Sequence, residues 1–320
     1  MKEITLEDKK IFDSFFKLYP PQVSELTFTN LFMWRKRYNF RYHVVDGYLY
    51  ILSFNEKHKF ILPPVGEVAY SEPADGPVNM HDNFYGDEQK LLERFADSLK
   101  QISQICRDQG VPLVFERVPK NMPEWFKKAS ARLGEDIDIQ YDRDNSDYVY
   151  LAQDLINLKG KKYDGKRNHI NKFKKTYAYE YVKFAPEHVP YAIEITEEWC
   201  RQKNCDCEND IHCEKNANIE LLNNIQHLNV TGALIKADGQ FQAYTVGEML
   251  NADTAVIHIE KANFSINGLY AFINNQFCAN EWHHATYINR EQDLGEEGLR
   301  KAKLSYNPYK IIDKYTIKFV

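Results

Sequence analysis

The order of predicted elements repeats within the chain, and this repeat constrains the fold more than any single motif. In the second half, hydrophobic periodicity predicts strands at 231–237, 240–248 and 254–261, then a helix, a short strand, a second helix and a last strand at 310–319. The turn signals Asp238-Gly239 and Asn251-Ala252-Asp253 separate the first three strands. Two amphipathic helices, at 186–201 and 216–227, precede them.

The first half gives a looser version of the same order. It predicts helices at 6–18 and 24–37, a hairpin that turns at Asp46-Gly47, and a third strand at 59–62. A long helix, a strand, a helix and a strand follow, at 87–109, 111–117, 122–133 and 138–141. The repeat predicts an α+β fold with a mixed sheet, made of two duplicated units at 1–145 and 146–320.

This element order resembles the GNAT acyltransferase fold, in which the third meander strand and the next helix N-terminus hold the acyl donor. Backbone amides at a helix N-terminus bind phosphate well. In the second half a short loop joins Glu260-Lys261-Ala262-Asn263 to Gly268-Leu269-Tyr270, whereas Pro63-Pro64 opens a long loop in the first half. We therefore expect the active site in 146–320 and a degenerate GNAT-like unit in 1–145.

Two segments near the C-terminus resemble a known family. They read I-H-I-E-K-A-N-F-S-I-N-G-L-Y, from Ile257 to Tyr270, and I-N-R-E-Q-D-L-G-E-E-G-L-R-K-A-K-L-S-Y-N-P, which ends at Pro308. The family takes its name from the C-terminal aminoacyltransferase domain of phosphatidylglycerol lysyltransferases, and the segments 159–173 and 34–38 resemble it as well. The resemblance implies a tandem GNAT pair, similar to the peptidoglycan-building aminoacyltransferases that use aminoacyl-tRNA.

The resemblance implies transfer of an acyl or aminoacyl group to an amine or hydroxyl. The donor would be a coenzyme A thioester or an aminoacyl-tRNA, and the acceptor a small molecule or a lipid. The membrane-bound lysyltransferases carry an integral membrane part, but this sequence has no run of about 18 apolar residues and no apolar signal peptide. We therefore expect a cytoplasmic protein, with at most peripheral contact with an anionic membrane.

Acyl transfer onto an amine needs a base with a pKa near neutrality, and four acidic or imidazole side chains are candidates, one of them Asp293. A period of two places His258 and Glu260 on one face of the third strand, beside the donor junction. Glu291, after the next strand, is the alternative base. Tyr306 could protonate a leaving thiolate or ribose oxygen, or could simply fill the core.

The donor loop supplies the residues that we predict to bind the cofactor. They are Lys261, Asn263, Gly268 and Tyr270. Glycine lets the backbone come close to a phosphate or pantetheine group, and the amides of the following helix would bind the anion. An ordinary turn is the structural alternative.

The stretch after the short strand predicts a helix with Asp293 as its N-cap and Glu296 in a capping box. Gly295, Gly298 and Ala302 share one face of that helix, and we expect this smooth face to pack tightly on the sheet. Arg290 could bind a phosphate or carboxylate. Further predicted substrate-binding residues in this stretch are Asp293, Arg300 and Lys303.

A basic segment contrasts with the net charge of -5 for the whole chain. Eight Lys or Arg residues lie between Lys159 and Lys175, and Ile170, Phe173 and Tyr177 recur at helical spacing. The pattern predicts a helix that is apolar on one side and basic on the other. It could bind tRNA or an anionic lipid, with Lys166 and Arg167 as contacts, or could be a solvated structural helix. A non-catalytic module that binds an anionic partner through this segment is the alternative function.

The tract from Trp199 to Cys213 contains four of the six cysteines and His212. Zinc sites commonly space cysteines two to four residues apart in two separated pairs, and this tract lacks that pattern. We expect reduced thiols and no bound metal here, with a metal site as the alternative.

Overall fold

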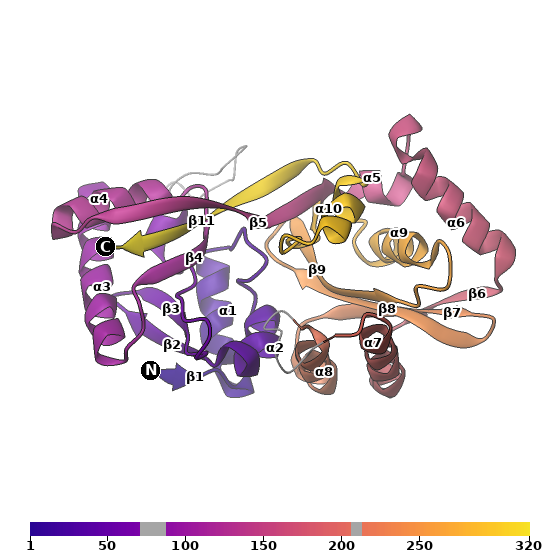
Figure 1. Ribbon diagram of the computed structural model, residues 1–320, viewed down its shortest axis with the longest axis horizontal. Coiled ribbons are helices and arrows are strands. Elements are labelled where there is room, and N and C mark those ends of the chain that lie inside the picture. Colours follow the sequence, from indigo (N-terminus) through magenta and orange to yellow (C-terminus); the bar gives the residue numbers. More distant parts are fainter. Residues whose placement is uncertain (71–87, 206–212) are drawn as a thin grey trace. The chain divides into compact units, whose positions relative to one another are not determined.

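The chain divides into two compact units in the computed structural model, which describes residues 1–70, 88–205 and 213–320 (Figure 1). Met1–Asp147 and Ile312–Val320 form the first unit, and Tyr148–Ile311 forms the second. The last strand therefore lies with the N-terminal residues. Duplicated domains at 1–145 and 146–320 remain a proposal about the origin of the chain, and the compact units differ from them in this final segment.

The elements of the first unit follow the predicted order. They are β1 (Lys2–Glu3), η1 (Leu6–Asp8), α1 (Lys9–Leu18), α2 (Phe28–Tyr38), β2 (Phe40–Val45), β3 (Tyr48–Ser53), η2 (Glu67–Tyr70), α3 (Glu88–Asp108), β4 (Val114–Pro119), α4 (Pro123–Leu133), β5 (Ile137–Leu151) and β11 (Lys310–Phe319). The unit boundaries fall within β5 and β11. The predicted third strand at 59–62 makes isolated bridges instead of a ladder. Ile61 pairs antiparallel with Leu52 and parallel with Phe115, and Pro63 and Pro64, which lack an N–H group, follow it directly.

The second unit contains a mixed sheet with helices on both faces. Its elements are α5 (Ala152–Asn157), η3 (Lys161–Tyr163), α6 (Asp164–Thr176), β6 (Tyr179–Lys183), η4 (Pro186–His188), α7 (Val189–Gln202), α8 (Lys215–Asn223), η5 (Ile225–His227), β7 (Thr231–Ala237), β8 (Gln240–Met249), β9 (Thr254–Ala262), α9 (Leu269–Glu281), β10 (Tyr287–Asn289) and α10 (Glu297–Leu304). The strand order is β5-β10-β9-β8-β7-β6, and only β9 and β10 pair in parallel among these described strands. Helix α9 covers one face, and α7 and α8 cover the other (Figure 1).

Strand β11, from the second half of the sequence, pairs with a strand of the first half. Strand β10 pairs antiparallel with β5, through Ile288 and Tyr150, and β4 pairs antiparallel with β11, through Val118 and Tyr315. Hydrophobic periodicity predicts a strand but not its partner, so the pairing of β4 with β11 was not foreseeable from the pattern.

A β-bulge interrupts the alternation of side chains along β9. Val246 pairs with Ile259, but the next residue, Gly247, pairs with Ile257, so His258 is an extra residue in the strand. Ile257 and Glu260 consequently face α9: the first belongs to the core beneath α9, and the second accepts a hydrogen bond from Asn274 of α9. The prediction that His258 and Glu260 share a face is therefore wrong, because the bulge shifts the period of two by one residue.

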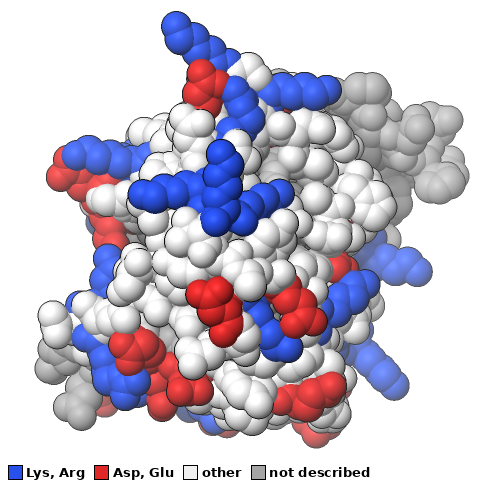
Figure 2. Space-filling model, turned by 90° about the vertical axis from the view of Figure 1, so that its right-hand side faces the viewer, with Lys and Arg blue, Asp and Glu red and all other residues white. Residues whose placement is uncertain are grey.

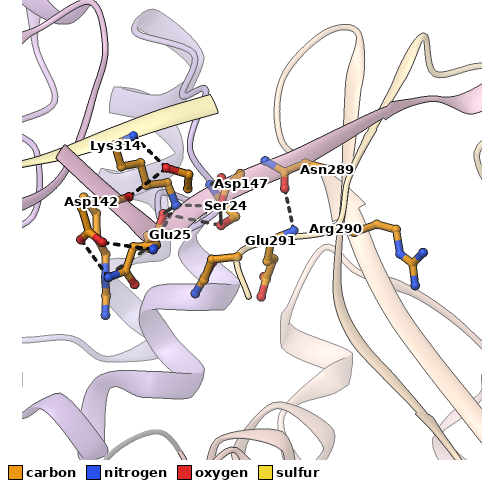
Figure 3. A network of polar contacts seen from close by, with 12 residues as sticks. Ser24, Glu25, Asp142, Asp147, Asn289, Arg290, Glu291 and Lys314 are labelled. Carbon is orange, nitrogen blue, oxygen red and sulfur yellow. Dashed lines mark hydrogen bonds and ion pairs between the residues drawn. The ribbon is translucent and has the colours of Figure 1, made fainter. Parts of the chain in front are cut away.

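Each unit has its own hydrophobic core, and the first unit also contains a buried ion cluster. Phe95, Phe115 and Phe126 lie at the centre of the first core, and Tyr148 and Phe277 lie in the second. In the ion cluster, Figure 3 shows Lys314 between two carboxylates, and its ammonium group lies 2.7 Å from both Glu25 and Asp147. No helix in the described ranges is both long and apolar enough to cross a membrane.

Candidate active site

Glu260 and Arg290 meet on the α9 face of the second unit. Because β9 and β10 run in parallel, the loop after β10 projects from the same edge of the sheet as the end of β9. Nη2 of Arg290 donates to Oε1 of Glu260 at 2.9 Å, and Nδ2 of Asn274 donates to Oε2 at 2.8 Å. Both carboxylate oxygens are therefore hydrogen-bonded, and Glu260 holds Arg290 and Asn274 in place.

Two tyrosine rings and a lysine surround the Arg290 guanidinium. Cζ of Arg290 lies 4.7 Å from the ring centroid of Tyr306 and 5.8 Å from that of Tyr150. Nζ of Lys166, from α6, lies 3.8 Å from the Tyr306 ring centroid. Burial and the nearby Arg290 charge lower the pKa of Lys166 to about 8, although Glu260 acts in the opposite direction. A substantial fraction of Lys166 is therefore neutral near physiological pH.

Two buried polar atoms of this cluster have no hydrogen-bond partner among the described residues. They are Nη1 of Arg290, which is a donor, and Oδ1 of Asn274, which is an acceptor. Leaving such a group unsatisfied costs about 1–3 kcal/mol, so buried unpaired groups that converge are typical of a site for a polar ligand. The arrangement can bind a group that presents both an acceptor and a donor.

The sequence reasoning missed Asn274. Helix α9 is otherwise apolar at its buried positions, which include Ala271, Phe272 and Phe277. A single amide within an apolar stripe was the signal that could have identified it, because a buried amide needs polar partners.

The loop that carries Arg290 is held in an unusual backbone conformation. Glu291 and Leu294 have φ angles of 58° and 54°, which non-glycine residues rarely adopt. The buried ammonium group of Lys303 donates to the carbonyl oxygen of Arg290 at 2.6 Å and also to that of Gln292. Lys303, a predicted substrate-binding residue, therefore contacts the backbone of the loop and fixes the position of Arg290.

Asp293 and Arg300 also stabilise this loop. The fully buried Asp293 carboxylate accepts hydrogen bonds from Nε and Nη2 of Arg300, at 2.9 and 2.8 Å, and from the Tyr148 hydroxyl at 2.5 Å. Burial alone would raise the pKa of Asp293, but the bonds from Arg300 and Tyr148 outweigh it and lower the pKa to about 2. These two predicted substrate-binding residues thus pair with each other.

Two predictions about the following helix are wrong. Helix α10 begins at Glu297 with Glu296 as its N-cap, so Asp293 is not the cap. Gly295 precedes the helix with a φ of 77°, and a Cβ atom at Gly298 would meet nothing within 4 Å. The glycines therefore do not form a closely packed face. Gly295 serves a turn, because Asp293 accepts a hydrogen bond from its amide.

His258 and Glu291 lie together but apart from Glu260. Nδ1 of His258 is 2.9 Å from Oε1 of Glu291, and Nε2 is 2.9 Å from Oε1 of Glu248. Burial opposes the charged form, but the hydrogen bonds to Glu248 and Glu291 outweigh it and raise the pKa of His258 to about 9. Figure 3 shows the Arg290 and Glu291 side chains pointing in different directions from the end of β10. The bulge and this divergence separate two of the predicted bases from the Glu260 cluster.

The predicted cofactor residues contact other side chains of the protein, and two of them, Lys261 and Tyr270, contact Trp199. Lys261 pairs with Glu214 at 2.9 Å, and Asn263 donates to the side chain of Gln242. The Tyr270 hydroxyl accepts a hydrogen bond from the Trp199 indole at 2.8 Å.

Gly268, the remaining predicted cofactor residue, lies against the backbone of α6. It has a φ of 86°, and a Cβ atom there would lie 2.2 Å from the carbonyl oxygen of His169. What comes close to this glycine is therefore the protein's own helix α6, which covers the start of α9.

Helix α6 has the predicted amphipathic character. Ile170 and Phe173 are buried, and Figure 2 shows Lys and Arg side chains gathered over the upper part of one face, where α6 lies. The exposed basic residues on or next to the helix are Lys159, Lys161, Lys162, Lys172, Lys174 and Lys175. Arg167 instead binds the carbonyl oxygens of Leu158 and Gly160 and the carboxylate of Asp164. We call the six exposed lysines the α6 basic surface.

Known proteins share the fold over the whole chain. A conserved protein of unknown function from Bacteroides thetaiotaomicron is 33% identical, with a TM-score of 0.83, and the match covers 100% of this chain and 99% of that one. The L-PGS structure from Bacillus licheniformis has a TM-score of 0.64 at 14% identity, covering 97% and 91%. FemX also has a TM-score of 0.64, at 9% identity, covering 99% and 96%. The α+β fold of tandem GNAT-like units is thereby confirmed.

Sequence comparisons agree with the fold. An uncharacterized Mycoplasmoides gallisepticum protein is 24% identical over 203 residues, and this match spans 62% of either protein. The family model described as "Phosphatidylglycerol lysyltransferase, C-terminal" matches residues 85–318, which is well over half of the chain. This family and this fold are those of aminoacyl and acyl transferases. The chain belongs to the phosphatidylglycerol lysyltransferase C-terminal-domain family.

Proposed function

We propose that the second unit transfers an aminoacyl group from an aminoacyl-tRNA to an amine or hydroxyl acceptor. The site consists of Glu260, Asn274, Arg290, Lys166 and Tyr306. Two unpaired buried atoms carry this proposal, Nη1 of Arg290 and Oδ1 of Asn274. An aminoacyl ester offers a carbonyl oxygen to the first and an α-ammonium group to the second, whereas a simple acyl group offers only the carbonyl.

Helix α6 covers the start of α9, and this favours a tRNA donor over a coenzyme A thioester. A thioester bound in the GNAT manner would place its phosphates against the amides at the start of α9. The backbone of α6 lies so close to Gly268 at this point that even a methyl group would overlap it. The α6 basic surface, in contrast, suits the phosphates of an acceptor stem.

The proposed reaction is direct attack of the acceptor on the ester carbonyl carbon. A bond from the acceptor nitrogen or oxygen to this carbon forms, and the bond to the ribose oxygen breaks. Arg290, fixed by Glu260, donates to the carbonyl oxygen as negative charge develops on it. Because this donor is held by Glu260 before the reaction begins, little reorganisation is needed.

Lys166 and Tyr306 carry the proton in the proposed reaction. Neutral Lys166 takes the proton of the attacking group, and the Tyr306 hydroxyl gives its proton to the leaving ribose oxygen. Burial raises the pKa of Tyr306 above its usual range, so this phenol holds its proton until the ribose oxygen leaves. Lys166, beside the Tyr306 ring, then returns a proton to the phenolate. Both residues finish in their starting states.

The experiment is a transfer assay with radiolabelled aminoacyl-tRNA. Purified protein is mixed with charged total tRNA and with vesicles containing phosphatidylglycerol, and label is followed into the lipid, into added amines and into free amino acid. Loss of one oxyanion donor typically costs about 10²–10³ in rate, so Arg290→Gln should slow transfer by that amount. Lys172→Met, on the exposed side of α6, is the matched control for Lys166→Met.

The proposed donor and the proposed site are tested by different outcomes of this assay. Label that moves at equal rates with wild-type protein and with Arg290→Gln would refute the site. Transfer from acetyl coenzyme A in place of aminoacyl-tRNA would refute the donor.

A non-catalytic module that binds an anionic partner is the second candidate function. The α6 basic surface supports it, because its six lysines are exposed. In that case tRNA or anionic vesicles would bind with a steep salt dependence, and no label would move under any condition. Binding would be equal for wild-type protein and Arg290→Gln but weaker for a variant that neutralises Lys172, Lys174 and Lys175.

A further inference from the structure

Three cysteine sulfur atoms converge at one end of the α7 and α8 helices. They belong to Cys200 in the last turn of α7, Cys205 just after this helix, and Cys213 just before α8. All three Sγ atoms lie within 4.8 Å of one another. Cys200 and Cys213 are 8% exposed. The sequence spacing predicted no such site, because it lacks two separated pairs.

The backbone at the end of α7 brings the first two sulfur atoms together. Asn204 has a φ of 51°, and the amide of Cys205 donates to the carbonyl oxygen of Cys200 at 3.1 Å. This left-handed turn reverses the chain directly after the helix. The convergence therefore depends on a defined turn and on the packing of α7 against α8.

Cys200 and Cys205 are reduced, as predicted, but Cys213 is disulfide-bonded, which differs from the prediction. Cys207 and His212, the other candidates of the tract, lie outside the described residues. A thiol reductant would convert the disulfide to thiols and be oxidised to a disulfide itself. In the reduced protein, three thiols from described positions would face one another.

We propose that the reduced tract binds one thiophilic divalent cation of the zinc class through Cys200, Cys205 and Cys213. While Cys213 is disulfide-bonded it is not available as a ligand, so metal binding requires the reduced protein. With Zn–S bonds of about 2.3 Å, tetrahedral geometry places sulfur atoms about 3.8 Å apart, a spacing that the 4.8 Å limit accommodates. Each thiol releases its proton as the metal binds, and the fourth ligand is not one of these three.

The surroundings fit a structural site better than a catalytic one. Cys200 and Cys213 are both buried, and the three sulfur atoms lie within 4.8 Å of one another. Lys261, Glu214 and Trp199 pack beside the tract, with Nζ of Lys261 3.4 Å from the Trp199 ring centroid. A metal would tie the end of α7 to the start of α8.

The test is a cobalt and zinc titration of the full chain, purified with a phosphine reductant. Co²⁺ bound by thiolates gives intense sulfur-to-metal charge-transfer bands, whose intensity reports the number of sulfur ligands. We expect about one equivalent per chain, with binding at least about 100-fold weaker in Cys205→Ser, because even outer-shell changes cost 10–100-fold. Cys106→Ala, in the core of the first unit, is the control and should bind as wild type.

A second measurement does not depend on a variant. Alkylation mapped by mass spectrometry should show Cys200, Cys205 and Cys213 protected by Zn²⁺, with Cys278 unchanged. A disulfide-forming oxidant should release the metal. Reduced wild-type protein without thiolate bands, or with unprotected cysteines at saturating Zn²⁺, would overturn the proposal, and so would Cys205→Ser protein that binds Co²⁺ like wild type.

Discussion

The proposed mechanism predicts that the rate of transfer depends on pH through the titration of Lys166. With a pKa of about 8, Lys166 is neutral in about 1% of molecules at pH 6 and about 10% at pH 7. If the neutral amine takes the acceptor proton, the single-turnover rate rises about tenfold between these two pH values and levels off above pH 8. A lysine of ordinary pKa would be only about 0.04% neutral at pH 7, so burial increases the active form by more than 100-fold.

Two substitutions move the midpoint of this profile in opposite directions. Glu260→Gln removes a negative charge that raises the pKa of Lys166, so the midpoint moves to lower pH. Arg290→Gln removes a positive charge that lowers this pKa, so the midpoint moves to higher pH. Both variants are slower than wild type, because Glu260 and Arg290 belong to the site, but the midpoint is independent of the maximal rate.

Single-turnover transfer of labelled aminoacyl groups at constant ionic strength measures the profile. Spontaneous hydrolysis of the ester at high pH is subtracted with an enzyme-free sample, and Lys172→Met controls for charge changes on α6. The reasoning is refuted if the profile is flat between about pH 6 and pH 8, or if Lys166→Met keeps the wild-type midpoint.

Three further predictions concern stability. Lys314→Met removes the ammonium group that lies between two buried carboxylates and should lower the free energy of unfolding by about 3–5 kcal/mol in urea titrations, whereas Lys318→Met at the exposed surface should not change it. The pKa of His258 is raised to about 9, so protonated His258 stabilises the folded protein fully below the unfolded pKa of about 6.5, and this stabilisation is lost as pH rises through 9. His258→Gln should abolish this pH dependence of the free energy of unfolding. Gly298→Ala should stabilise α10 by about 0.5–1 kcal/mol, whereas Gly268→Ala should destabilise the protein in the same thermal scan, because its Cβ would overlap α6 backbone.

The sequence predicted the elements of the second unit well because their signals are local. The Asp238-Gly239 turn has two positive φ angles, as its residue types indicate, and strands β7 to β9 lie within one residue of their predicted bounds. The order of elements, together with the family resemblance, was sufficient to identify the fold. These signals depend on neighbours in the sequence, which a pattern reports directly.

The candidate site was less predictable because it depends on exceptions to regular geometry. One extra residue at His258 separated two predicted partners, and a helix that begins at Glu297 moved Asp293 out of its cap. Arg290 and Glu260 were both identified, but their pairing required the parallel register of β9 and β10. Hydrophobic periodicity does not report which distant strands pair.

The pairing of β11 with β4 determines when the first unit can finish folding. Among the described strands, β4 pairs antiparallel with β11, nearly two hundred positions later in the sequence, so the first unit closes only after β11 has left the ribosome. Until then Phe115 and the edge of β4 remain open to other chains, which favours chaperone binding or aggregation. Long-range pairing of this kind raises contact order and slows folding. The first unit therefore cannot become stable before β11 has been synthesised, although the elements of the N-terminal half follow a complete order.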